Sequence, residues 1–156
     1  MNIQTHFLLP FFLGLILYKL GFVSVGLAVV CGLVGMLIDM DHVIEHMLHQ
    51  KKNRFSLRAA WNNSIRFHRF NQRSLIHSWP GLLILSGVFL LVVWWNWRWS
   101  WILAIGYYSH LVLDFGDFRE RKFLRWEIEG VYLKESYKEI VLNLFLLMGI
   151  VLLLLV

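Results

Sequence analysis

Aspartates and histidines occur at the ends of otherwise apolar segments in this 156-residue chain. The run MLIDMDHVIEHMLH, which begins at Met36, places Asp39, Asp41 and His42 directly after an apolar stretch. Asp39 and His42 are three residues apart, and residues three or four apart on a helix share one face. An imidazole nitrogen and a carboxylate oxygen on one face can bind a divalent cation, with bonds of roughly 2.0–2.2 Å to zinc. The spacing therefore predicts a metal site.

A second pair, His110 and Asp114, has the same chemistry at a spacing of four residues inside the apolar run SHLVLDF. Ionisable residues in membrane segments are costly unless they are paired or bind an ion. His6 and His77 lie at the starts of two other apolar segments. The alternative for each residue is an ordinary capping, interfacial or solvated side chain. We predict six metal ligands: His6, Asp39, His42, His77, His110 and Asp114.

Other polar residues could assist such a centre. Asp41 is predicted to be the general base that accepts a proton from a metal-activated water; its alternative roles are to orient a ligating histidine or to bridge to a second metal. Arg69 and Arg73 could bind a phosphate by forked hydrogen bonds, or could simply add positive charge at the membrane surface. His46 and His49 are expected to be solvated and to lie outside the site.

The composition is that of a membrane protein, with 58% hydrophobic residues, 16% charged residues and a mean hydropathy of +0.60. Five apolar segments, at about 3–20, 22–38, 79–97, 101–115 and 140–156, approach the roughly 20 residues that cross a bilayer. We expect an all-α, polytopic membrane bundle of about five transmembrane helices, two hairpins plus one, in a single domain of residues 1–156. Cys31 is the only cysteine, which excludes an intrachain disulfide and a cysteine-based zinc site.

The basic residues predict the orientation in the membrane. Of the 15 lysines and arginines, all except Lys19 and Arg98 fall in two long connections, at about 43–76 and 117–138. Positive charge marks the cytoplasmic side, so we expect a multi-pass protein of the inner (plasma) membrane with its N-terminus and its site cytoplasmic. The net charge of +5 is then no argument for nucleic acid. The tryptophans between positions 94 and 101 would form a belt at the outer interface, and the basic, aromatic stretch Phe118–Glu135 is predicted to be an interfacial helix.

Four short motifs, in order, resemble a known family: TH at Thr5–His6, DMDH at Asp39–His42, HS at His77–Ser78 and HLVLD at His110–Asp114. Over about residues 3–117 the chain resembles the LexA-regulated, membrane-bound, metal-dependent hydrolases (YdjM-like proteins), a group placed with zinc-dependent phospholipase C and the S1/P1 nucleases. The resemblance implies a helical site for two or three zinc ions that cleaves phosphoric esters. The chain departs from the family pattern at Ile38, where a proline is usual, and at Gln72, where a histidine is expected. His68 is a displaced candidate ligand, so the number of ions, from one to three, stays open.

These observations together predict a membrane-embedded, metal-dependent hydrolase. Its substrate would be a phosphoric ester of a phospholipid or lipid-linked phosphate at the cytoplasmic face, and its cofactor zinc, with manganese as an alternative. Its partners would be the bilayer and that substrate, and nucleic acid is not expected as the main partner. The alternatives are a non-enzymatic metal-binding protein, a metal or proton transporter and a b-type haem protein. Transport is disfavoured because the outer halves of the apolar segments carry no ionisable residue.

Overall fold

The computed structural model describes residues 3–62, 75–115, 123–128 and 131–155. The elements in chain order are α1 (Ile3–Lys19), α2 (Val25–Leu37), α3 (Met40–His49), α4 (Leu57–Asn62), the 3-10 turn η2 (Leu75–His77), α5 (Trp79–Phe115), β1 (Phe123–Ile128), β2 (Val131–Ser136) and α6 (Tyr137–Leu155). The predominantly helical fold is confirmed, and one short β-hairpin adds to it.

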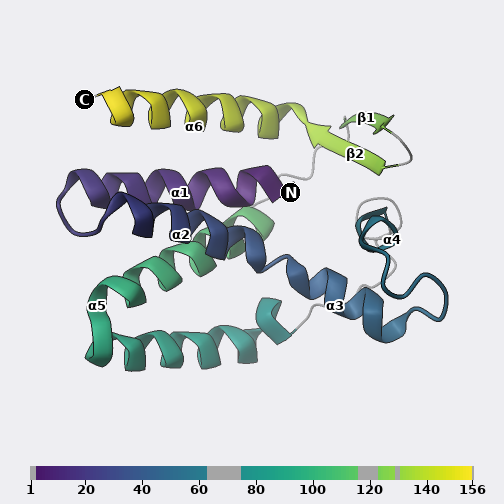
Figure 1. The fold of residues 1–156 in the computed structure, drawn as a ribbon, viewed down its shortest axis with the longest axis horizontal. Coiled ribbons are helices and arrows are strands. Elements are labelled where there is room, and N and C mark those ends of the chain that lie inside the picture. The colour runs from purple at the N-terminus through teal and green to yellow at the C-terminus, as the bar shows by residue number, and fades with distance from the viewer. Residues whose placement is uncertain (1–2, 63–74, 116–122, 129–130, 156) are drawn as a thin grey trace.

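Helix α1 is central in the bundle. Helix α2 returns alongside it after a tight turn, and α6 lies along its other side (Figure 1). Leu15, Ala28 and Ile150 form a buried apolar cluster where these three helices meet. A second cluster joins Cys31 of α2 to Ile102 of α5. Apolar packing therefore fixes α2, α5 and α6 around α1, directly or through α2.

Helix α5 reverses its direction at Asn96, whose backbone leaves the helical conformation (φ −157°, ψ 103°). The Asn96 side-chain oxygen accepts a hydrogen bond from the backbone N–H of Arg98 at 3.1 Å, which satisfies a free donor at the start of the second half of the helix. The two halves then pack against each other: the Ser100 hydroxyl donates to the carbonyl of Phe89 at 2.7 Å, and the Phe89 and Tyr107 rings are 5.7 Å apart. The apolar segments predicted at 79–97 and 101–115 thus form a folded-back pair inside one kinked element.

Two helices among the described residues, Trp79–Asp114 and Tyr137–Leu155, are long and apolar enough to cross a membrane. The five spans expected from the sequence are not confirmed. Helix α2 has 13 residues, which at 1.5 Å per residue reach only about 20 Å of a ~30 Å hydrocarbon core. Most side chains of the two long helices are exposed rather than buried in the bundle, as in helices that face lipid.

The interfacial helix predicted over Phe118–Glu135 is wrong. Residues 123–128 and 131–136 form an antiparallel hairpin, in which Phe123 lies opposite Ser136 and Ile128 lies opposite Val131. The strand sequences FLRWEI and VYLKES are rich in aromatic and branched side chains, and the first alternates apolar with charged residues over Leu124–Ile128, a period of two that favours strands. The basic and aromatic composition is compatible with either structure, and the period of two in the first strand distinguishes them.

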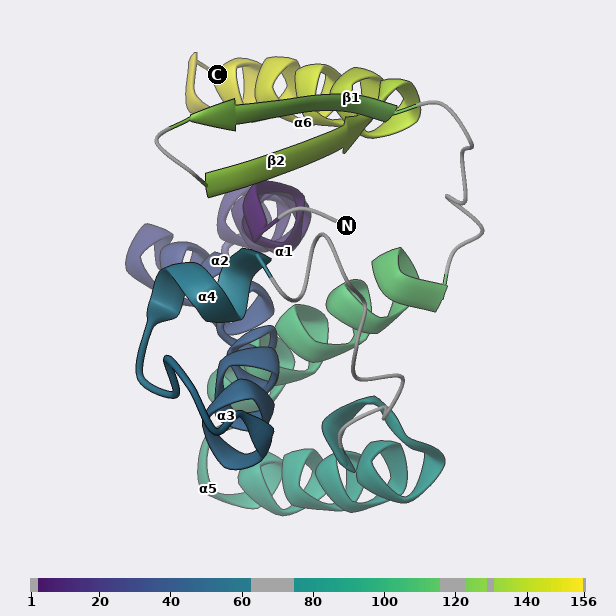
Figure 2. The ribbon, with the colours of Figure 1, turned by 90° about the vertical axis from the view of Figure 1, so that its right-hand side faces the viewer.

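The two ends of the bundle differ in chemistry. Figure 2 looks onto the end that carries the N-terminus, α3, α4 and the C-terminal end of α5. The opposite end carries the α1–α2 turn, the bend of α5 and the C-terminus (Figure 1). At that opposite end the ring of Trp97 contacts the ring of Phe22, with centroids 6.2 Å apart. The tryptophan cluster and Lys19 are therefore at the end away from the acidic and histidine residues.

Candidate metal centre

The helix is interrupted between α2 and α3, and this interruption directs Asp39 and Asp41 toward histidines. Helix α2 ends at Leu37, and Asp39 occupies the junction before α3 begins at Met40. Asp39 makes no side-chain capping bond, so its carboxylate is available to other groups. On a continuous helix, residues two apart would point to different faces. The break instead lets both Asp39 and Asp41 contact histidines of the cluster.

Four donors converge on one point, from α1, α5 and the α2–α3 junction: His6, Asp39, His110 and Asp114. Each offers one donor atom, and these atoms lie within 4.8 Å of one another. His6 Nε2 is 3.2 Å from Asp114 Oδ1 and 3.8 Å from Asp39 Oδ2, and His110 Nε2 is 3.2 Å from Asp114 Oδ2 and 3.6 Å from Asp39 Oδ1. Donors around a tetrahedral cation with bonds of 2.0–2.2 Å are about 3.3–3.6 Å apart. These contacts between histidines and aspartates use both oxygens of each carboxylate, and with one donor atom from each residue inside 4.8 Å the group could hold a single cation.

His110 has its tautomer fixed by Gly35. Its Nδ1 lies 2.8 Å from the Gly35 carbonyl oxygen, which can only accept, so Nδ1 carries the proton and donates. In the neutral ring Nε2 is then a lone pair, and it faces the Asp114 carboxylate and, at 2.9 Å, His77 Nε2. Acceptors facing acceptors repel one another unless a proton or a cation lies among them. A hydrogen bond on the far nitrogen is also how proteins orient histidines that bind metals.

His77 approaches the same point from η2. Its Nδ1 lies 2.8 Å from Asp41 Oδ2, and its Nε2 lies 3.3 Å from Asp114 Oδ2. Burial alone would lower the pKa of His77, but hydrogen bonds to Asp114 and Asp41 and the charges of both carboxylates raise it to about 10. In the metal-free protein a proton on His77 therefore supplies part of the positive charge that a cation would otherwise supply.

This raised pKa predicts how the stability of the metal-free protein depends on pH. Because folding raises the pKa of His77 from 6.5 to about 10, its contribution is complete below about pH 6.5 and is lost as the pH rises through about 10. We expect the Tm of the chelator-treated protein to fall over this range, and to fall less in the variant Asp41→Asn. A Tm that falls equally in both proteins would contradict the assignment, since other groups that titrate at high pH are common to both.

His6 is fully buried, and its Nε2 faces two carboxylates, Asp114 Oδ1 at 3.2 Å and Asp39 Oδ2 at 3.8 Å. A buried nitrogen between two carboxylates needs either a proton or a bound cation among them. The His6 ring stacks on the His110 ring with centroids 4.1 Å apart. That stacking leaves no room for a porphyrin between them, which argues against the haem alternative.

The family of the chain follows from comparison with known proteins. The family model described as YdjM inner membrane protein matches residues 1–123. The chain belongs to the YdjM inner membrane protein family. No curated protein and no solved structure matches it. All four converging donors, together with His77 and Asp41, lie within the part that the YdjM model covers, whereas β2 and α6 lie beyond it.

Several predicted site residues of this YdjM family member are placed differently or not described. Asp41 is buried with its Oδ2 2.8 Å from His77 Nδ1, the contact expected of its orienting alternative, and its general-base role stays a prediction. His46 is buried rather than solvated, with Nε2 3.1 Å from the Asn53 carbonyl oxygen, because the chain after α3 folds back over it. The following lie outside what the structure describes: the side chains of His42 and His49, and residues His68, Arg69, Gln72 and Arg73.

Sequence reasoning missed three residues that position the centre. Gly35 accepts the hydrogen bond from His110, and Tyr107 donates its hydroxyl to the Ile76 carbonyl at 2.7 Å, next to His77. Glu139 of α6 is buried and accepts a hydrogen bond from Thr5, the neighbour of His6, at 2.9 Å. The motif Ser-x-x-Glu at 136–139 was a visible signal for the start of α6, and Ser136 does accept a bond from the Glu139 N–H. The contact partners of these residues had no local signal.

Proposed function

We propose that this YdjM family member is a metal-dependent hydrolase of phosphoric esters. The observation that carries the proposal is the convergence of His6, Asp39, His110 and Asp114 at one end of the bundle. Two carboxylates balance the charge of one divalent cation, and imidazole together with carboxylate suits zinc, with manganese as a second choice. The fully buried His6 supports the same reading, because its Nε2 faces the carboxylates of both Asp39 and Asp114.

The residues divide the work of such a centre. A divalent cation would supply Lewis acidity, which acidifies water and polarises a phosphoryl oxygen. Gly35 and Asp41 hold His110 and His77 with their Nε2 atoms toward the centre. The side chains of Asp39 and Asp114 are 20% and 26% exposed, so a proton taken up by either can pass to solvent. Asp41, only 7% exposed, suits an orienting role better than that of the base.

The described side chains account for one cation. Further ions would need donors outside them, such as His42 or His68. We propose that the cluster binds one zinc ion, and that a second ion would need donors such as those residues. In two-metal sites, ions about 3.5–4 Å apart hold the attacking and leaving oxygens of a phosphoryl group.

We further propose that α1, α2, the two halves of α5 and α6 all lie in the bilayer, with the centre at the cytoplasmic face. The basic residues outside the two long connections, Lys19 and Arg98, lie at or beside the α1–α2 turn and the α5 bend. These are at the end opposite the centre (Figure 1). The other thirteen lysines and arginines fall in the two long connections. Because positive charge marks the cytoplasmic side, those connections and the centre would face the cytoplasm, within reach of lipid headgroups.

One experiment tests the proposed activity. The detergent-purified full chain is analysed for bound metal and assayed against phosphomonoesters and phosphodiesters, each as a lipid and as a soluble headgroup. We expect bound zinc or manganese, release of phosphate or of a phosphorylated headgroup, loss of activity in a chelator and recovery when zinc is restored. If the protein binds no divalent metal, the proposed metal centre is wrong. If the metal-loaded protein is inactive on every ester, the proposed hydrolase activity is wrong and the metal-binding site remains supported.

A further inference from the structure

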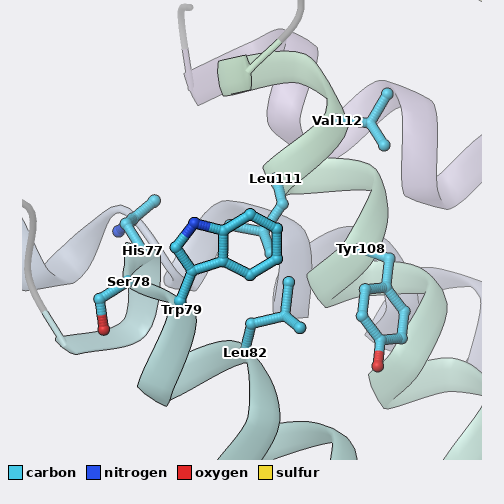
Figure 3. Close-up of a pocket in the computed structure, with 7 residues that line it drawn as sticks. All are labelled: His77, Ser78, Trp79, Leu82, Tyr108, Leu111 and Val112. Carbon is cyan, nitrogen blue, oxygen red and sulfur yellow. The ribbon is translucent and has the colours of Figure 1, made fainter.

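A pocket of about 280 Å³ lies beside the metal centre, between the two halves of α5. Its walls come from both halves: Trp79 and Leu82 from the first, and Tyr108, Leu111 and Val112 from the second (Figure 3). His77 and Ser78 lie at one end, next to Trp79, and the Tyr108 hydroxyl on the other side is already paired with the Ser86 hydroxyl. The lining is therefore mostly apolar, with His77 and Ser78 as the polar residues at the end near the metal centre.

One residue, His77, connects the pocket to the metal centre. His77 lines the pocket and also places its Nε2 2.9 Å from His110 Nε2 and 3.3 Å from Asp114 Oδ2. A molecule in the pocket that contacts the His77 ring is thus separated from the converging donors by that ring alone. This layout suits an amphiphile whose polar group lies at the centre and whose apolar part extends along α5.

Hydrogen bonds hold the walls of the pocket in place before any ligand binds. The Ser86 hydroxyl and the Tyr108 hydroxyl are 2.5 Å apart and link the two halves of α5. Tyr107 holds the chain before His77 through the carbonyl of Ile76. A preformed apolar pocket loses little conformational entropy on binding.

We propose that this pocket binds one acyl chain of a lipid whose phosphate group lies at the metal centre. This inference rests on the proposed function and names its substrate as a lipid, not a soluble ester. Both walls of the pocket belong to α5, which is long and apolar enough to cross a membrane, and two of the lining residues, Trp79 and Val112, are exposed. An acyl chain can therefore enter the pocket sideways from the bilayer. The volume is at the lower end of ligand pockets, roughly 300–1,000 Å³, which suits part of one chain rather than a whole lipid.

Photolabelling tests binding without using activity. The full chain is reconstituted in phosphatidylcholine vesicles that contain a little phosphatidic acid with a diazirine in one acyl chain, illuminated and digested, and the labelled residues are found by mass spectrometry. We expect the label on Leu82, Leu111 or Val112 above the level on the exposed face of α6. An even distribution over both helices would mean that bulk lipid alone touches the pocket, and would overturn the proposal.

Two matched tryptophan substitutions add a second readout. Val112→Trp fills the pocket, whereas Val141→Trp adds the same bulk to α6; the two valines are 65% and 66% exposed. We expect Val112→Trp to lose the pocket label and to lower the ratio of turnover on long-chain phosphatidic acid to that on glycerophosphate by about tenfold, because remote binding energy raises turnover. Val141→Trp should keep the pocket label and the wild-type ratio of turnover on the two esters.

The outcomes separate the two proposals. Pocket labelling that Val112→Trp abolishes, in a protein without hydrolase activity, supports the lipid site and rejects the proposed function. Hydrolysis in which Val112→Trp lowers the rates on both esters equally, with the label retained, rejects the lipid site and leaves the proposed function intact. Metal content, measured on both variants, shows whether the centre itself has been disturbed.

Discussion

Replacing Asp114 with alanine is expected to empty the metal centre. Its two oxygens lie 3.2 Å from His6 Nε2, 3.3 Å from His77 Nε2 and 3.2 Å from His110 Nε2, so Asp114 is the acid that contacts three imidazoles within the described part of the chain. Without it one carboxylate, Asp39, would remain to balance a divalent cation. Loss of a group that merely orients a ligand already costs about 10–100-fold in metal affinity. We expect a larger loss for Asp114→Ala, with hydrolysis at background.

The measurement is zinc content per chain after purification, followed by titration against a chelating indicator. Leu91→Ala on the same helix is the control, because Leu91 is exposed and far along the sequence from the donors. Asp114→Asn keeps the shape of the side chain and removes its charge, so it should fall close to Asp114→Ala if charge balance governs affinity. Wild-type zinc content in Asp114→Ala would exclude the centre, and with it the hydrolase.

The location of the centre could be predicted from the sequence because hairpins alternate direction. Apolar segments that run back and forth bring every second end to the same side, so the positions of His6, Asp39, His77, His110 and Asp114 at those ends were sufficient. The structure confirms that these five side chains come together. The end at which each side chain lies depends on the order and polarity of the segments, and not on their packing angles or exact lengths.

The role of each residue could not be predicted in the same way, because it depends on contacts between distant segments. Asp41 and Asp39 make different contacts because the helix ends at Leu37 and Asp41 then meets His77, which is far away in the sequence. No proline marks that break. The buried pair Thr5 and Glu139 joins the two ends of the chain, and Glu139 reads locally as a solvated residue at the start of a helix.

Gly35 is the residue at which the fold and the centre depend most directly on each other. A Cβ added to Gly35 would overlap the His6 carbonyl oxygen, lie 2.5 Å from Pro10 Cγ and lie 3.4 Å from the Gly106 carbonyl oxygen. The first two contacts involve backbone and a rigid ring, neither of which can move aside cheaply. Helices α1, α2 and α5 therefore meet at a point where only hydrogen fits, and the carbonyl of the same residue orients His110.

We expect Gly35→Ala to push α1 away from α2 and so to move His6 from Asp39 and His110. Overpacking of this kind costs about 1–3 kcal/mol, which should lower Tm by several degrees. It should also weaken zinc binding, because two of the three helices that carry donors are displaced. Tm and zinc affinity are measured on the same preparation, so that reduced metal binding can be compared with reduced folding.

Gly87→Ala on α5 is the matched control, because a Cβ there meets nothing within 4 Å. Alanine is favoured over glycine inside a helix by about 0.5–1 kcal/mol, so this variant should keep its zinc and melt at the wild-type temperature or slightly above. If Gly35→Ala behaved like Gly87→Ala, the close approach of α1 to α2 would not hold in the folded protein. The distances between His6 and its partners depend on that approach, so a centre built from all three helices would then have to be abandoned even if zinc were found in the wild type.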